Sequence, residues 1–460
     1  MSVQKPIKTS ISITVAAIMA ASAHAGSFSL YTEGNGAATG NYAAGIAAEA
    51  ADASIGWYNP AGLALLHDEQ AVFGAVGVAP DSILTGSSIY HTPGFPDYIQ
   101  SYSNINGGKN ALVPSFHYAR PLGENSTVGL SVVSPFGLST DWGRAGPVRY
   151  AATVSELVTT NISPEIGGRL SENFAIGAGV DLQYARVKFN QIIGSPATLD
   201  AIGQPPILFD SYSYNSGHSF GVGFHAGLMM MVNDDHTRIG LNYQSIMNHK
   251  FHGYSRLKGR LASPTLSDDY AVFMSNHLSS NSIELPDIVT LSGYHDVNES
   301  WAVLGSVVYT GWQSLKTIQL NNVAAFVPVT QALVDSVATE YYKNVWRFSV
   351  GANYKVNTRL MMRAGLGYDQ TPTRDAYRDV RIADSNRWAT AIGAHYQARP
   401  NIGLDLGYTH LFSQGDWVNK TQAIGTSSYT VSAHAKGSAD LVGVQLTWLM
   451  DGVEPSNMKA

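Results

Sequence analysis

The stretch Leu441-Val-Gly-Val-Gln-Leu-Thr-Trp448 has the alternation of a β-strand. Side chains two positions apart share one face of a strand, so one face of this stretch carries only apolar side chains. They are Val442, Val444, Leu446 and Trp448. The opposite face is mixed and includes Gln445 and Thr447. This combination is typical of a strand that separates lipid from a more polar interior.

The same period-two pattern recurs from residue 71 onward. In 358–369, one face carries Leu360, Met362, Ala364, Leu366 and Tyr368. We predict fourteen strands, at 71–79, 111–120, 125–134, 157–170, 173–190, 217–232, 236–250, 284–296, 299–315, 343–355, 358–370, 385–397, 400–413 and 437–449.

Short polar turns and long loops alternate between these segments. The long loops are 80–110, 135–156, 191–216, 251–283, 316–342, 371–384 and 414–436. An even number of strands, with short turns at one end and long loops at the other, is the pattern of outer-membrane barrels. A soluble sandwich has no reason to alternate short and long connections along the whole chain. The sequence therefore predicts an all-β fold, a 14-stranded antiparallel transmembrane β-barrel.

The N-terminus and the composition indicate a bacterial envelope. Residues 1–25 have the features of a secretory signal peptide, with Lys5 and Lys8 before a short apolar run and Ala23-His24-Ala25 as the cleavage site. No later run of eighteen apolar residues follows, which excludes helical membrane spans. The chain has no cysteine, and its net charge of −6 argues against a nucleic-acid partner. We therefore predict a multi-pass protein of the cell outer membrane of a Gram-negative bacterium.

Residues 26–70 have neither the alternation of a strand nor a full apolar helical stripe. This segment is rich in glycine and alanine, which allow close backbone packing, and it ends with Asp52-Ala-Ser-Ile-Gly-Trp-Tyr-Asn59-Pro60-Ala61-Gly62-Leu63. We expect an N-terminal plug, or hatch, inside the lumen, with Asn59, Pro60 and Ala61 as its gate. An ordinary Asn-Pro turn is the alternative for these three residues. The barrel then spans 71–449, and 450–460 form a C-terminal tail.

Signatures of catalysis are missing from the sequence. The 14 histidines include no HExxH pair, there is no GxSxG elbow, and the glycines of 34–40 lack the spacing of a dinucleotide loop. We therefore predict neither an enzyme nor a bound metal or cofactor. A diffusion porin and a surface adhesin or receptor are the alternatives to a transporter. A porin needs an open aqueous lumen, which a plug would block.

Several short motifs occur one after another along the chain, in a characteristic order. They are Gly34-Asn-Gly-Ala, Asn59-Pro60-Ala61, Ser134-Pro-Phe-Gly-Leu138, Tyr184-Ala-Arg-Val-Lys188, Leu285-Pro-Asp287, Tyr309-Thr-Gly-Trp312 and Asp369-Gln-Thr-Pro372. In this order and spacing they resemble the FadL-type outer-membrane transporters of long-chain fatty acids and other hydrophobic compounds.

The resemblance implies a route and its residues. Ligand is caught by an apolar groove of the outer loops, passes to an interior pocket, and leaves sideways when the hatch moves. The exit is implied at a kink after the third strand, here Pro135, Phe136 and Gly137. The alternative is that this strand simply ends at Ser134. The resemblance also implies a monomer.

Two long loops carry apolar side chains suited to capture. Ile207 and Phe209 lie in loop 191–216, and Phe273 and Met274 lie in loop 251–283. Exposed apolar clusters of this kind mark binding surfaces, and packing within the loops is the alternative.

The sequence does not decide whether the ligand has an acidic headgroup or none. Phe189 and Gln191 are expected to line the interior pocket, but the best-known fatty-acid member of the family has an arginine where this chain has Gln191. Lys343 and Arg347, on the inward parity of the tenth strand, are candidates to bind a carboxylate instead. A neutral aromatic or aliphatic hydrocarbon is the alternative ligand.

Two further expectations concern charged residues. Lys343 and Arg347 pair in the alternative interpretation with the inward acids Glu165, Asp181 or Asp405, because charges inside a barrel usually pair. Arg186 and Lys188 share the parity of the lipid-facing residues of their strand. We expect both to point outward toward lipopolysaccharide phosphates.

Overall fold

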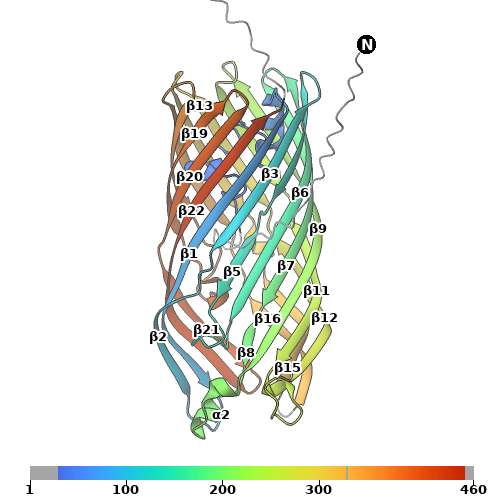
Figure 1. Cartoon of the computed structure of the whole chain (residues 1–460), viewed down its shortest axis with the longest axis vertical. Coiled ribbons are helices and arrows are strands. Elements are labelled where there is room, and N and C mark those ends of the chain that lie inside the picture. Colours follow the sequence, from blue (N-terminus) through green and yellow to red (C-terminus); the bar gives the residue numbers. More distant parts are fainter. Residues whose placement is uncertain (1–28, 328–329, 451–460) are drawn as a thin grey trace, which may run out of the picture.

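The structure, a computed structural model, describes residues 29–327 and 330–450 (Figure 1). The expected signal peptide and the tail beyond Met450 lie outside this part. Fourteen strands form the wall: β1 (Gln70–His91), β3 (Ala111–Pro121), β4 (Ser126–Val133), β6 (Val154–Ser171), β7 (Phe174–Phe189), β9 (Ser211–Val232), β10 (Thr237–Gln244), β13 (Ile288–Asp296), β14 (Trp301–Thr310), β17 (Val345–Lys355), β18 (Leu360–Asp369), β19 (Arg387–Arg399), β20 (Ile402–Ser413) and β22 (Ser427–Leu449).

Every neighbouring pair in this wall is antiparallel, and the ring closes between its first and last strands. β1 pairs with β22 along its whole length, from Gln70 opposite Leu449 to His91 opposite Ser428. On its other edge β1 pairs with β3. The prediction of a closed 14-stranded antiparallel barrel is confirmed.

Eight additional strands extend the wall at the end where the connections are long: β2 (Tyr98–Asn106), β5 (Gly137–Asp141), β8 (Gln191–Ile193), β11 (Met247–Lys258), β12 (Val272–Leu285), β15 (Thr317–Val327), β16 (Thr330–Thr339) and β21 (Asp416–Ile424). In Figure 1, β2, β15 and β21 lie in the lower part of the molecule, whereas β5 lies higher, in the wall beside β6. The expectation of loops in 80–110, 251–283, 316–342 and 414–436 is therefore wrong in part. Beyond the lipid, both faces of a hairpin meet water or neighbouring loops, so their sequences need no regular alternation.

Several strand boundaries also differ from the prediction: β1 extends to His91 and β22 begins at Ser427, well beyond the expected 71–79 and 437–449. The expected strand 236–250 divides at Ser245 into β10 and β11, and these two strands pair with different partners, β13 and β12. β14 ends at Thr310, five residues earlier than expected. β17 begins at Val345, which leaves Lys343 in the preceding connection.

The helices are short. They are α1 (Ile55–Tyr58), α2 (Pro196–Ala201), and the 3-10 helices η1 (Ala37–Gly40), η2 (Pro60–Leu65), η3 (Pro206–Leu208), η4 (Arg260–Ala262), η5 (Trp312–Ser314) and η6 (Val380–Ile382). No helix in 29–327 or 330–450 is long and apolar enough to cross a membrane.

The outer face of the barrel is apolar and has aromatic side chains near the strand ends. Trp301, Trp346, Trp388 and Trp448 are all exposed. Three outward pairs stack across neighbouring strands at ring distances of 4.5–5.1 Å: Trp301 with Tyr354, Tyr309 with Trp346, and Tyr368 with Trp388. Amphipathic rings at these positions suit the two membrane interfaces.

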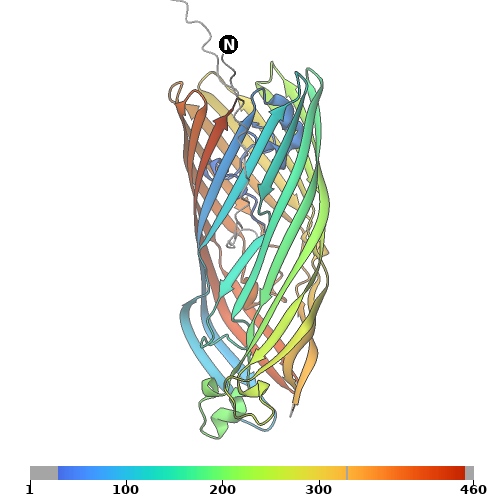
Figure 2. The ribbon, with the colours of Figure 1, turned by 45° about the vertical axis from the view of Figure 1, so that its right-hand side comes forward.

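Residues 30–66, the N-terminal segment, lie inside the barrel, and most of them are buried. Figures 1 and 2 show them in blue within the upper part of the lumen. Their backbone bonds to inward side chains from around the ring. Thr409 of β20 donates to the Thr39 carbonyl at 2.6 Å, and Ser306 of β14 accepts from the Gly45 amide at 2.8 Å. These contacts fix the segment against several strands at once.

Candidate functional site

Asn59 is the residue that joins two parts of the N-terminal segment to the wall. Its side-chain amide donates to the carbonyl of Ala47 at 2.8 Å and to the carbonyl of Leu228 in β9 at 3.0 Å. Its side-chain oxygen accepts from the Ala61 amide at 3.2 Å and so caps η2. Pro60 begins η2, where a missing amide proton costs nothing. The same three residues, Asn59 to Ala61, therefore form the turn and hold the N-terminal segment against the wall.

Glycines in the wall provide the space for this turn. A Cβ at Gly177 of β7 would collide with the backbone of Pro60 and Ala61, and a Cβ at Gly227 of β9 would collide with the Asn59 side chain. The two glycines face each other across neighbouring strands. The wall is thus shaped to receive the turn.

We expect the substitution Gly177→Val to unseat the turn while leaving the barrel closed. Overpacking a filled site costs roughly 1–3 kcal/mol, which corresponds to about fivefold to 150-fold in the unseated population. Because the chain has no cysteine, a single cysteine at buried Ala48 reports this population through its maleimide labelling rate. Gly293→Val is the matched control, since a Cβ there meets nothing within 4 Å. Equal labelling rates in both variants would contradict the glycine seat.

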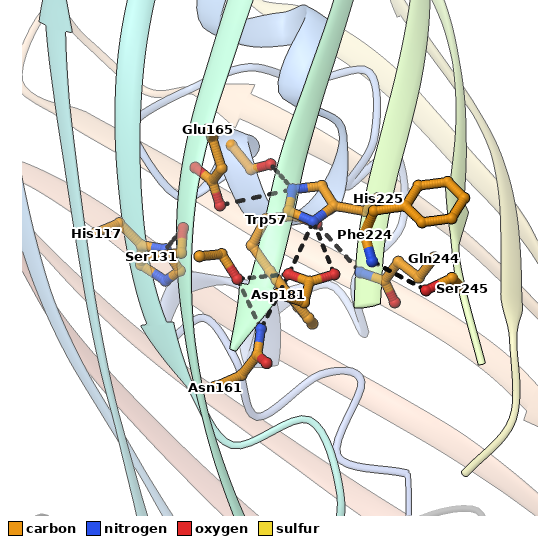
Figure 3. A network of polar contacts seen from close by, with 12 residues as sticks. Trp57, His117, Ser131, Asn161, Glu165, Asp181, Phe224, His225, Gln244 and Ser245 are labelled. Carbon is orange, nitrogen blue, oxygen red and sulfur yellow. Dashed lines mark hydrogen bonds and ion pairs between the residues drawn. The ribbon is translucent and has the colours of Figure 1, made fainter. Parts of the chain in front are cut away.

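A buried polar network holds the residues just before Asn59 (Figure 3). His225 of β9 contacts Asp181 of β7 at 3.0 Å through Nδ1 and the Gly56 carbonyl at 3.2 Å through Nε2. Gln244 donates to the Trp57 carbonyl at 3.2 Å. These contacts connect α1 directly to the wall.

The same network contains two of the three inward acids, Glu165 and Asp181. Asp181 accepts from Ser163 at 2.6 Å and from Asn161 at 3.1 Å, and Glu165 lies 3.7 Å from His225. Asp405 pairs with Arg363 at 3.3 Å and with His395 at 3.0 Å. Glu165 and Asp181 thus share His225, and Asp405 contacts Arg363 and His395, so the alternative in which Lys343 or Arg347 pairs with these acids is wrong.

The wall is interrupted at the expected kink. β4 ends at Val133 opposite Asn161, and β5 begins at Gly137 opposite Val158, so the β4 side holds one extra residue. Proline lacks the donor that a ladder needs, and extra residues of this kind bend a strand. On the neighbouring side, residues 111–115 of β3 pair with β1 but not with β4 or β5.

The first described residues of the N-terminal segment cover this interruption. Ser29 forms a β-bridge with Phe136, and the Leu30 amide donates to the Pro135 carbonyl at 2.9 Å. Thr159 of β6 holds Phe136 from the other side, donating to its carbonyl at 2.6 Å. An unpaired stretch of wall would be costly in lipid, and here the chain's own N-terminal residues satisfy part of it.

The two basic candidates lie in different surroundings. Arg347 is buried, donates to the hydroxyl of Thr32, and lies over the ring of Tyr42 at 3.9 Å. It therefore binds the N-terminal segment. Lys343 is exposed, and its amide donates to the Pro372 carbonyl at 3.0 Å. The two residues do not form one site.

A different cation reaches the expected pocket residues. Arg381 of η6 is partly buried, donates to the side-chain oxygen of Gln191 at 3.1 Å, and lies 5.9 Å from the Phe189 ring centre. Its other acceptors are the Ala151 carbonyl at 2.7 Å and the Ser155 hydroxyl at 3.2 Å. Arg381 forms no ion pair with any residue that the structure describes, and burial lowers its pKa.

Glu340, in the connection between β16 and β17, is the buried acid near this arginine. Burial, reinforced by the charge of Asp379, raises the pKa of Glu340 to about 8. It is therefore mostly protonated at neutral pH and does not cancel the Arg381 charge. Lys420 of β21 lies close by and donates to the Thr339 carbonyl at 3.2 Å. With Glu340 neutral, the partly buried Arg381 and Lys420 outnumber Asp379, so the region carries a net positive charge.

An apolar cluster joins the interruption to this cationic end. Phe136 contacts Trp312 at a ring distance of 6.0 Å, and Trp312 contacts Tyr342 at 5.7 Å. The same cluster includes Ile382, next to Arg381, and Phe189 packs against it. At its other end Tyr31 and Tyr58 belong to the N-terminal segment.

The four loop residues expected to capture ligand divide into two kinds. Ile207 and Met274 are each half exposed. Phe209 is partly covered by Arg260, whose guanidinium lies 4.4 Å from its ring centre, and Phe273 packs against a buried cluster around Leu257. Phe209 and Phe273 are therefore packed within the loops, while Ile207 and Met274 are exposed, as are Leu208 and Tyr270.

Sequence reasoning missed Arg381 and His225. Arg381 lies in a connection with no periodicity, and its contact with Gln191 joins residues 190 positions apart. His225 had a usable signal, because it shares the inward parity of β9 and its strand pairs with the one that carries Asp181. Within the described residues, no group of three or more acidic or histidine side chains is placed to hold a metal ion.

Comparison with known proteins agrees with this architecture. The chain is 26% identical to a "Long-chain fatty acid transport protein" of Escherichia coli O6:H1, over 97% of this chain and 99% of that protein. A Pseudomonas aeruginosa FadL homologue has the same fold, with a TM-score of 0.78 at 22% identity, covering 92% of this chain and 99% of the other.

The fold is also shared, more distantly, by the Ralstonia pickettii toluene transporter TbuX. The TM-score is 0.59 at 16% identity, covering 86% of this chain and 94% of the other. The family model described as "Outer membrane protein transport protein (OMPP1/FadL/TodX)" matches residues 16–449. With its closed barrel, lumenal N-terminal segment and interrupted wall, the chain belongs to this family of outer-membrane transport proteins.

Proposed function

We propose that the chain takes up long-chain fatty acids or similar hydrophobic compounds across the outer membrane. Ligand is captured by the outer loops, enters the apolar cluster of the lumen, and leaves sideways between β3 and β5 when the N-terminal segment moves as a hatch. The observation that carries this proposal is the interruption at residues 134–136, covered by Ser29 and Leu30. The printed name of the E. coli relative supports the same ligand class.

The apolar cluster supplies the driving force for a hydrophobe. Each buried methylene of a ligand gains roughly 0.8 kcal/mol, so a chain that threads between aromatic and aliphatic side chains is strongly held. The cluster runs from the hatch residues Tyr31 and Tyr58 past Phe136 to Ile382. It therefore places apolar side chains on both sides of the proposed exit.

Arg381 favours an acid over a neutral ligand. A partly buried guanidinium that has only neutral acceptors lacks an ionic partner, and a carboxylate is the partner that its planar donors fit best. It contacts Gln191, where the resemblance had placed a basic residue. We therefore assign the carboxylate contact to Arg381, and no longer to Lys343 or Arg347.

The remaining parts of the proposal concern alternatives and surroundings. A neutral hydrocarbon remains the second ligand class, supported by the likeness to the toluene transporter fold. The proposal assigns no catalytic step to the chain. The barrel acts as a monomer surrounded by outer-membrane lipid and lipopolysaccharide.

The test compares an oleate-type acid with a matched neutral hydrocarbon, each bound to the refolded barrel. We expect Arg381→Gln to weaken the acid by roughly tenfold to 150-fold, since hydrogen bonds to charged groups contribute about 1.5–3 kcal/mol, and to leave the hydrocarbon unchanged. Arg381→Lys should retain part of the acid affinity, and Lys343→Ala should have no effect. Equal binding of both ligands, insensitive to Arg381, would favour the hydrocarbon reading. Failure of both ligands to bind would remove the transport proposal.

The pH dependence of acid binding gives an independent check. Because the pKa of Glu340 is raised to about 8, its carboxyl is neutral below that pH and becomes an anion above it. A fatty carboxylate, with an ordinary pKa near 4, is ionised throughout. We expect acid affinity to fall as the pH rises from 7 to 9, because ionised Glu340 then competes for Arg381. Glu340→Gln should flatten this fall, which titration calorimetry at several pH values can measure.

A further inference from the structure

The outer face of β7, β9 and β11 carries a compact group of basic side chains. The group, called the basic band below, consists of Arg186, Lys188, His218, Lys250, His252 and Arg256. Cross-strand register brings its members together, because Arg186 lies opposite His218 and His218 lies opposite His252. All six side chains are at least partly exposed. The chain as a whole is acidic, so this concentration of positive charge is local.

The height of the basic band is set by the lipid-facing residues beside it. On β7, the outward side chains from Phe174 to Tyr184 are apolar or aromatic and exposed, and Arg186 is the next outward residue. Ten residues of strand, tilted by about 45°, span roughly 23 Å, which matches an apolar band about 25 Å tall. Arg186 therefore lies at the membrane interface. It lies on the side of the long connections, which is the extracellular side.

A hollow of about 470 Å³ lies within the basic band. It is lined by His218, Phe220, Asn248, Lys250 and His252 among others. Phe220 is one of the most exposed aromatic side chains on the outer face and marks the lipid edge of the hollow. The hollow thus presents one ammonium and two imidazole groups beside an exposed aromatic ring, which suits an amphiphile with an anionic headgroup.

The charges of the basic band are only partly neutralised. Glu156 pairs with Arg186 at 2.8 Å and with Lys188 at 3.0 Å. Lys250 and Arg256 form no ion pair with a described residue. Counting Arg186, Lys188, Lys250 and Arg256 against Glu156 leaves a formal charge of +3 (4 − 1). Glu284 of β12 lies opposite Asn248 and therefore diagonal to Lys250, at the edge of the basic band that is nearer the middle of the membrane.

Aromatic rings hold Arg256 in place. Its guanidinium lies 4.7 Å from the ring centre of Tyr254 and 5.6 Å from that of Tyr214, and the two rings stack at 5.7 Å. Stacking occupies the face of the guanidinium and leaves its N–H edges for a ligand. An arginine held in this way is suited to phosphate, which takes several charge-assisted hydrogen bonds at once, and the register brings Lys188 close to the same aromatic pair.

We propose that the basic band binds the phosphorylated headgroup of lipopolysaccharide in the outer leaflet. The phosphates contact Lys250, Arg256 and Arg186, and the acyl chains lie against Phe220 and the apolar residues below it. The occupant is chosen by position and charge, because lipopolysaccharide is the lipid that presents phosphates at the outer surface of this membrane. This site is separate from the lumen and does not depend on the proposed transport function.

The test uses the refolded full-length barrel and native mass spectrometry with defined lipids. Lipid A with both phosphates is expected to bind about tenfold or more tightly than the same lipid without phosphates. The double variant Lys250→Gln with Arg256→Gln should lose a similar factor. Lys355→Gln with Arg359→Gln, which removes two exposed charges at the opposite end of the barrel, is the control and should change nothing.

Three results would overturn the proposal. They are equal binding of the phosphate-free lipid, unchanged binding by the Lys250/Arg256 variant, and equally tight binding of phosphatidylglycerol or inorganic phosphate, which would indicate a general anion surface. Heat-modifiable migration on gels checks that each variant is folded. If the double variant does not fold, the comparison of the two forms of lipid A on the unchanged chain still decides the outcome.

Discussion

A disulfide between cysteines at positions 29 and 136 is expected to stop hydrophobe uptake completely, and a reductant is expected to restore it. Ser29 and Phe136 form an antiparallel bridge, and the Leu30 amide bonds to the Pro135 carbonyl, which makes them a pair without mutual hydrogen bonds. In such pairs the Cα atoms are about 4.5 Å apart, within the range that a disulfide spans. The crosslink would fix the N-terminal residues over the interruption in the wall.

The absence of native cysteine makes this experiment clean. The single variants Ser29→Cys and Phe136→Cys show the effect of each side chain alone, and uptake by neither should change when reductant is added. Uptake of a labelled long-chain acid into cells is the measurement, with the crosslink verified by mass. Full uptake by the verified crosslinked form would exclude exit between β3 and β5 and would favour a path through the lumen.

The barrel could be predicted from sequence because the membrane acts on each strand separately. Lipid requires an apolar side chain at every second position, so the requirement is written locally, as in Val442 to Trp448. The same requirement does not fix where a wall strand ends, because it applies only to the residues that face lipid. Beyond the lipid, strands such as β21 carry no such alternation, since Asp416, Asn419, Lys420 and Gln422 fall on both of its faces.

The site depends on contacts between residues far apart in the chain, and these are not written locally. The Asn59-Pro60-Ala61 turn was recognisable from its own chemistry, and so was the strand-breaking character of Pro135. Arg381 was not, because its environment arises only when a connection folds onto β6 and β8. Lys343 was misplaced because parity was extended beyond the end of β17.

Changing Asn59 to Asp is expected to abolish uptake while preserving the folded barrel and ligand capture by the outer loops. The asparagine amide donates to two buried carbonyls, those of Ala47 and Leu228. A carboxylate cannot donate to them and places negative charge against both. Leaving buried groups unsatisfied costs about 1–3 kcal/mol each, so the contact between the N-terminal segment and β9 is lost.

Three readings of the protein give different results in this variant, which makes it the most informative one. A transporter loses uptake of the labelled acid because hatch movement is no longer coupled to the wall. A porin keeps or increases its steady conductance for small hydrophilic solutes, and an adhesin keeps its surface binding, since the outer loops are untouched. Asn276→Asp, at an exposed position of β12, is the matched control and should retain full uptake. Normal uptake by Asn59→Asp would mean that the Asn59 contacts serve stability alone and that the gate lies elsewhere in the N-terminal segment.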